Sequence, residues 1–352
     1  MSTFDRRFVP SWNRGGDTHV SLSLSRGALA VLAAGFGVVG ATGISFPLEA
    51  GMVVYLVGMV ALNLPHGGYE HFENLRRRRP DFRLEYVAAY LAVIAGFVGL
   101  FVIAPVAGLA LALVVAMAKG GIGGLHVMDA TTGTGHLRTR PQRYLAAAVR
   151  GGAVMLVPIV FWPETFHTFS ALMVGLVEPG ALSPYTGYFD LTRTAIGAVY
   201  GTGLAAHVGL GYVRGGGRSW LVDAGESLLL ATYFAAVPVL VAVGLYFPFW
   251  YSARQVARTR TVRDDVGADR WDLLGDDPAT AALRAWGVLI AGALATFAVL
   301  AAVYLAFPNP LAGVGALPGA VAFWSVFISI VALPHIVVGS TFDTERGIWY
   351  VP

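Results

Sequence analysis

The chain has 352 residues, of which 56% are hydrophobic and 13% charged, and its mean hydropathy is +0.65. A soluble domain carries about 25% charged residues, so this composition excludes an ordinary soluble domain and indicates a membrane protein. The absence of cysteine excludes disulfides, iron–sulfur clusters, thiolate zinc sites and cysteine nucleophiles. The net charge of +3 comes from arginines scattered through short loops, a pattern that does not suit nucleic acid.

The N-terminal segment differs from the rest of the chain. Residues 1–26 are polar and contain four arginines, and they lack the short apolar core and small-residue cleavage site of a signal peptide. We therefore expect a polar N-terminal arm over residues 1–26, followed by a first apolar run that is retained as a membrane span.

Long apolar runs recur from residue 27 onward. A bilayer core needs roughly 20 apolar residues in a helix, and unpaired backbone amides are not tolerated there, so these runs predict an all-α, polytopic transmembrane helix bundle. The expected spans are 27–48, 51–71, 86–104, 105–126, 144–162, 194–213, 227–250, 285–307 and 312–339, with a weaker run at 165–178. They predict nine or ten helices in one domain, 27–352, with a solvated polar loop at 252–284.

Arginine clusters predict the orientation of the bundle. If 165–178 spans, which we prefer, the clusters on the arm, at 76–83, at 138–143 and at 254–284 share one side with both termini. That side is expected to be cytoplasmic, in a multi-pass protein of the cell membrane. Only Arg214 and Arg218 then face outward, and if 165–178 does not span, the last two helices invert.

Histidines carry the chemical signal, because a polar ring in a membrane bundle is costly unless it is paired, liganded or wet. We interpret His19 and His136 as solvated surface residues and His167 as an interfacial one. In the ten-span topology His66, His126 and His335 come from distant helices but lie at similar depth on one side. Such convergence is what a buried metal site in a helix bundle requires, although three separately satisfied core histidines would give the same pattern.

Acids accompany two of these histidines. Glu70 follows His66 by four residues and Asp129 follows His126 by three, so each acid can share its histidine's helical face. Each could accept the second ring N–H of a metal ligand, or could contact loop arginines instead. His207 lies at the wrong depth in this topology, and for it a hydrogen-bonded packing role competes with metal ligation.

Several short motifs, spread in order over residues 60–350, resemble the Brp/Blh family of membrane β-carotene 15,15′-dioxygenases, and the composition resembles that of a haloarchaeal member. They are Asn63 to His71 (NLPHGGYEH), Gly123 to Asp129 (GGLHVMD), Trp162-Pro163-Glu164, and Leu333-Pro334-His335 followed by Asp343 and Arg346 to Trp349.

The resemblance implies a non-haem Fe(II) enzyme that cleaves the central double bond of β-carotene with O2, giving two retinal molecules for opsins. It implies His66, His126 and His335 as iron ligands and Glu164 as a supporting acid. The family usually has a further histidine where this chain has Val331, so either His207 or water completes the iron shell, or the site is altered and the activity is weakened or changed.

The expected partners are β-carotene, O2, membrane lipid and an opsin. The missing histidine leaves an alternative open, namely an accessory protein that binds carotenoid or retinal for opsin assembly and performs no chemistry. A proton-coupled transporter is a third hypothesis, but no repeated halves support it.

Overall fold

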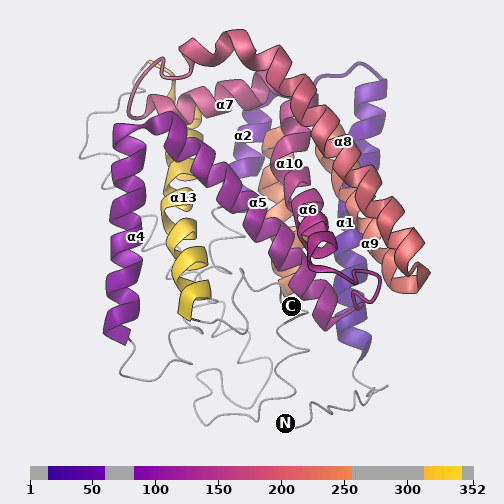
Figure 1. Cartoon of the computed structure of the whole chain (residues 1–352). Helices are drawn as coiled ribbons and strands as arrows, with labels where there is room; N and C mark the ends of the chain where they lie inside the picture. Colours follow the sequence, from indigo (N-terminus) through magenta and orange to yellow (C-terminus); the bar gives the residue numbers. More distant parts are fainter. Residues whose placement is uncertain (1–14, 60–82, 256–257, 259–312, 343–352) are drawn as a thin grey trace, which may run out of the picture.

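The computed structural model describes residues 15–59, 83–255, 258 and 313–342, and the regular elements among these residues are all helical (Figure 1). Six of the described helices are long and apolar enough to cross a membrane. The all-α class is thereby confirmed. The expected span at 285–307 and much of the one at 51–71 lie outside the described residues.

The elements follow the apolar runs, and prolines occupy the first turn of α5, α6 and α7, where a missing N–H costs nothing. In chain order they are α1 (Gly15–Ala41), α2 (Leu48–Leu56), α4 (Arg83–Ile103), α5 (Pro105–Ala130), α6 (Arg140–Phe161), α7 (Pro163–Gly175), the 3-10 helix η3 (Ser183–Tyr188), α8 (Phe189–Arg214), α9 (Gly217–Ala236), α10 (Val239–Tyr246), the π-helix η4 (Phe247–Ser252) and α13 (Ala316–Phe342). Helix α1 thus begins inside the expected polar arm, and residues 15–26 are helical.

Helix α7 shows that the weak run at 165–178 does not span. Its 13 residues correspond to about 20 Å, well short of a bilayer core of about 30 Å. Figure 1 shows it lying across one end of the bundle. The ten-span topology that counted this run as a crossing is therefore wrong at this point.

The run at 227–250, expected as one span, is two antiparallel helices. Pro238 has no N–H to continue a helix, and Val237 before it is extended, with φ −91° and ψ 131°. Beyond this break the chain reverses, since the Arg254 guanidinium reaches the Glu226 carboxylate at 2.7 Å. In one continuous helix these residues would lie about 40 Å apart.

One expected crossing is lost at 165–178 and one is gained by the reversal at Pro238. The two chain ends therefore stay on the same side, as expected. The start of α1 and the end of α13 lie at the same end of the bundle, opposite α7, and we call this the basal end (Figure 1). Helices α5 and α8 also finish there. Arg214 and Arg218 therefore lie at the basal end and not on the outer side that was expected for them. The cytoplasmic location of this end remains a prediction.

The two largest apolar clusters among the described residues lie in different parts of the bundle. One joins α1, α6, α9 and α10, and the other joins α4, α5, α7 and α13. Helices α5 and α6 connect them through glycine contacts so close that a Cβ on Gly121 would lie 2.0 Å from the Ala147 carbonyl oxygen. A Cβ on Gly151 would lie 1.9 Å from that of Met117. Small residues at such crossings are how membrane helices approach closely.

We predict that Gly121→Ala and Gly151→Ala each destabilise the protein by about 1–3 kcal/mol, because the added methyl group forces α5 and α6 apart. Unfolding of the detergent-solubilised protein measures this. The matched control is Gly99→Ala in α4, where the new methyl group meets nothing within 4 Å. An equal loss in the control would contradict the packing argument.

Candidate functional site

His126 lies toward the basal end of α5 and is buried, with 7% of its surface exposed. His335 lies toward the same end of α13, a helix that packs on α4, α5 and α7. Of the His335 and Val331 side chains nothing is described, and His66 and Glu70 lie outside the described residues. The structure thus brings the helices of two predicted ligands to one end of the bundle.

A small cavity lies beside the glycine-rich segment of α5 that precedes His126. It is lined by Gly120, Gly123, Gly124, Val127, Tyr246, Trp250, Tyr251, Arg254 and Gln255. The glycines leave room for polar side chains, since a Cβ on Gly123 would lie 3.2 Å from Gln255 Nε2 and one on Gly120 would lie 3.3 Å from the Tyr246 hydroxyl. Polar side chains therefore lie against the α5 backbone in the segment that precedes His126, within an otherwise apolar interior.

Asp129 pairs with an arginine, one of the two roles left open for it, but this arginine lies in the first turn of α6 and not in a loop. Its carboxylate pairs with Arg143 of α6 and accepts a hydrogen bond from the Thr134 hydroxyl. Arg143 also donates to the Thr134 hydroxyl oxygen at 2.8 Å. These contacts stabilise the loop between α5 and α6, which begins a few residues after His126.

Glu164 lies in the first turn of α7, where it is exposed. Since α7 crosses the end of the bundle opposite the basal end, Glu164 is remote from His126 (Figure 1). The structure does not place this acid where it could support a metal ligand on α5.

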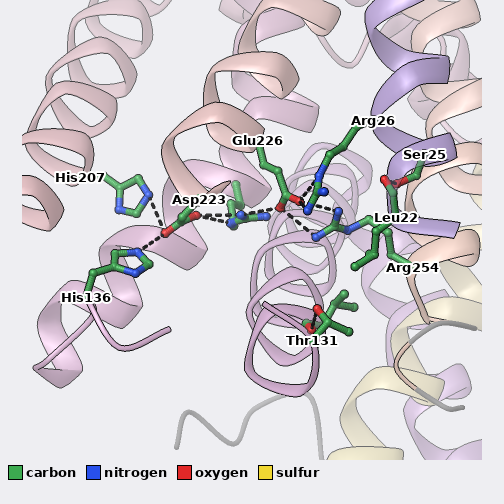
Figure 2. A network of polar contacts seen from close by, with 11 residues as sticks. Leu22, Ser25, Arg26, Thr131, His136, His207, Asp223, Glu226 and Arg254 are labelled. Carbon is green, nitrogen blue, oxygen red and sulfur yellow. Dashed lines mark hydrogen bonds and ion pairs between the residues drawn. The ribbon is translucent and has the colours of Figure 1, made fainter. Parts of the chain in front are cut away.

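The largest polar cluster is centred on Asp223 and Glu226, one turn apart on α9 (Figure 2). Arg150 of α6 bridges them, at 2.7 Å from Asp223 Oδ1 and 2.8 Å from Glu226 Oε2. Arg26 of α1 and Arg254 each reach Glu226 Oε1 at 2.7 Å. Both acids and two of the arginines are at most 2% exposed, and Arg26 is the exception.

Two histidines complete this network on Asp223 (Figure 2). His136 Nε2 lies 2.8 Å from Asp223 Oδ2 and its Nδ1 lies 3.1 Å from the Ser219 hydroxyl, while His207 Nε2 lies 3.3 Å from the same Asp223 oxygen. The interpretation of His136 as a solvated surface residue is wrong, because it is 1% exposed. Two roles were expected for His207, a hydrogen-bonded packing role and metal ligation. Its contact with Asp223 gives it the first.

The network extends to the α5 segment that carries His126. A Cβ on Gly124 would lie 3.6 Å from Arg150 Nη1, so the guanidinium fills the space that the glycine leaves. Gln255 Nε2 lies 3.5 Å from the Gly123 carbonyl oxygen. Arg150 and Gln255 thereby support the backbone two to three residues before His126.

Sequence reasoning missed most of this cluster. Arg254 was assigned to a solvated loop, yet it is 1% exposed and lies over the Trp250 ring at 4.4 Å. A usable signal was present: Arg150 interrupts an apolar run, and Asp223 and Glu226 share one face of a helix three residues apart. Opposite charges within apolar helices predict pairing.

Among the residues that the structure describes, no three histidine, aspartate or glutamate side chains are grouped so that they could hold a metal ion. His207 and His136 are bound to Asp223, whose other oxygen faces the Arg150 guanidinium, a poor neighbour for a cation. His126 is the one predicted ligand whose described side chain is not part of that ion-pair network. A metal at His126 would need the imidazole of His66, His335 or both.

Comparison with known proteins adds independent information. Residues 57–343 match the family "Beta-carotene 15,15'-dioxygenase". Over 98% of its length the chain is 55% identical to the probable β-carotene 15,15′-dioxygenase Brp of Halobacterium salinarum, covering 99% of that protein. Over 87% of its length it is 28% identical to Blh of the same organism, covering 88% of that protein. No solved structure matches.

We predict that Glu226→Gln destabilises the protein by about 3–5 kcal/mol, because it leaves buried arginine charges without their partner. Thermal or denaturant unfolding in detergent measures the loss. Glu178→Gln, at an exposed acid beyond α7, is the control and should stay within about 0.5 kcal/mol of the parent. Equal stabilities would show that the network contributes little to the fold.

Proposed function

Because this chain belongs to the β-carotene 15,15′-dioxygenase family, we propose that it cleaves the central double bond of β-carotene with O2 and forms two molecules of retinal. The observation that carries this proposal is the family match, which runs over residues 57–343 and includes the segments of all four candidate histidines. The similarity to Brp over nearly the whole of both chains supports it further.

The fold supports an apolar substrate. Six described helices are apolar enough to cross a membrane, and their outward faces carry exposed aliphatic side chains such as Val102, Val199 and Leu191. A carotenoid dissolves in hydrocarbon, so it would reach such a bundle from within the bilayer, and the retinal formed would leave by the same route to an opsin.

We further propose that His66, His126 and His335 hold a ferrous ion at the basal end. Imidazole nitrogens are suitable ligands for iron, and the chain has no thiolate to compete with them. Leu333 and Ile336, which flank His335 in α13, are buried in the same apolar cluster as Val115 of α5, so this part of α13 packs within the group of helices that includes α5. When bound, the iron would supply the binding and activation of O2.

The described residues would have positioning and solvent-excluding roles. Burial of His126 keeps water from its ring, and the salt bridge of Asp129 with Arg143 fixes the end of α5 on which the ring stands. The contacts of Arg150 and Gln255 with the glycine segment fix the preceding turn. A ligand held from both sides in this way keeps its orientation between turnovers.

We predict that membranes containing the protein form retinal from β-carotene only in the presence of O2, and that His126→Gln lowers this activity at least 100-fold together with the bound iron, because a ligand is lost. Retinal is measured by chromatography and iron by elemental analysis of the purified protein. The control is His167→Gln in α7, at the other end of the bundle, which should retain both.

Each result of this experiment has a defined reading. Retinal formation that is independent of O2, or unaffected by His126→Gln, would contradict the proposal. Carotenoid that copurifies unchanged with the parent protein, without any retinal, would favour the accessory carotenoid-binding alternative.

A separate prediction concerns His207. Since its Nε2 is directed to Asp223, His207→Gln should leave the iron content unchanged and lower the stability by about 1–3 kcal/mol. Iron per protein and the unfolding midpoint are measured on the same sample. Loss of iron from a protein that remains as stable as the parent would instead assign His207 to the iron shell.

A further inference from the structure

Four exposed arginines gather at the basal end, around the turn between α8 and α9. Arg138 precedes α6, Arg140 begins it, Arg214 ends α8 and Arg218 lies in the first turn of α9. They belong to segments that are distant in sequence, so the patch exists only in the folded bundle. We call these four residues the basal arginine patch.

The arginines of this patch lie close together. Arg214 Nη1 is 3.3 Å from Gln142 Oε1 and 3.4 Å from the Thr139 hydroxyl, so it reaches from α8 to the start of α6. Arg138 Nη2 lies 3.7 Å from the position that a Cβ on Gly215 would take, which places it over the turn that follows Arg214. Both groups that the Arg214 guanidinium contacts are neutral.

Within the described part of the chain, no acidic side chain pairs with any of the four arginines. Gathering like charges without a counter-charge is unfavourable. Two helix N-termini add to the positive potential, because α6 and α9 both begin here without a side-chain cap or an acid in the first turn. The region therefore attracts an anion.

The position of the patch indicates which anion it meets. The candidate membrane-crossing helices begin at Arg140 in α6 and end at Arg214 in α8, and arginines at the ends of such helices are expected where hydrocarbon gives way to headgroups. Exposed apolar and aromatic side chains adjoin them, namely Tyr144, Tyr212, Val213 and Leu221, between 57% and 80% exposed. Acyl chains beside a phosphate would contact both kinds of surface.

We propose that the basal arginine patch binds the headgroup of an anionic phospholipid. The phosphate is held by Arg138 and Arg214 over the α8–α9 turn, with Arg140 and Arg218 at its sides. The lipid neutralises the patch and joins α6, α8 and α9 at the membrane surface. The exposed apolar side chains beside the arginines match the acyl chains that accompany a lipid phosphate, which is why a lipid fits the surface better than an acidic soluble protein.

The test uses the full-length protein in nanodiscs of phosphatidylcholine that contain a small fraction of spin-labelled phosphatidylglycerol or spin-labelled phosphatidylcholine. We expect the protein to immobilise the anionic lipid in preference to the zwitterionic one. Each arginine near a membrane surface changes the affinity for anionic lipid about 5-fold, so Arg138→Gln with Arg214→Gln should weaken the preference roughly 25-fold. The matched control is Arg193→Gln, an exposed arginine at the other end of α8.

A second double variant, Arg140→Gln with Arg218→Gln, keeps the test valid if the first pair is poorly folded, and it should also reduce the preference. Equal immobilisation of the two lipids, or the same loss in Arg193→Gln, would overturn the proposal. So would displacement of the labelled lipid by millimolar inorganic phosphate at constant ionic strength, since the patch would then bind the free anion. Binding of an acidic polypeptide without any lipid preference would also overturn it.

Discussion

Neutralisation of buried charge is the constraint on which this structure depends. Asp223 and Glu226 lie on α9 in an apolar bundle, where an unpaired carboxylate would be too costly to maintain. Arginines from α1, α6 and the segment after η4 must therefore converge on that one turn of α9. The same contacts set the α9–α10 hairpin and, through the space beside Gly124, the position of the α5 segment that leads to His126.

The polar interior is divided between two sets of residues. His136 and His207 are part of the ion-pair network, in which every carboxylate oxygen has a cationic or imidazole partner. His126 stands on the glycine-rich segment of α5, whose backbone contacts Arg150 and Gln255. The network and its neighbours therefore support the helix that carries this buried histidine.

Sequence reasoning located a helix correctly where that helix consists of a single long apolar run. The apolar runs that became α4, α5, α6 and α8 were located to within a few residues at most ends. It failed at 165–178, where a short run between two longer ones was counted as a crossing, and at Pro238, where an apolar run conceals a reversal of the chain. Proline is tolerated within membrane helices, so its presence alone does not distinguish a kink from a turn. The contact between Glu226 and Arg254 makes that distinction.

The sequence by itself indicated a membrane protein, its helical class and its family. It could do so because hydrophobicity, helical length and short motifs are local properties of the chain. It also identified His126 as a buried polar residue. Only the tertiary structure decided which charges meet. Arg150, Asp223 and Glu226 stand out in the sequence as charges within apolar runs, but the sequence does not say which charges pair. Ion pairing depends on distances between segments up to 200 residues apart, as for Arg26 and Glu226. Such distances are set by the packing of whole helices, and a single segment does not contain that information.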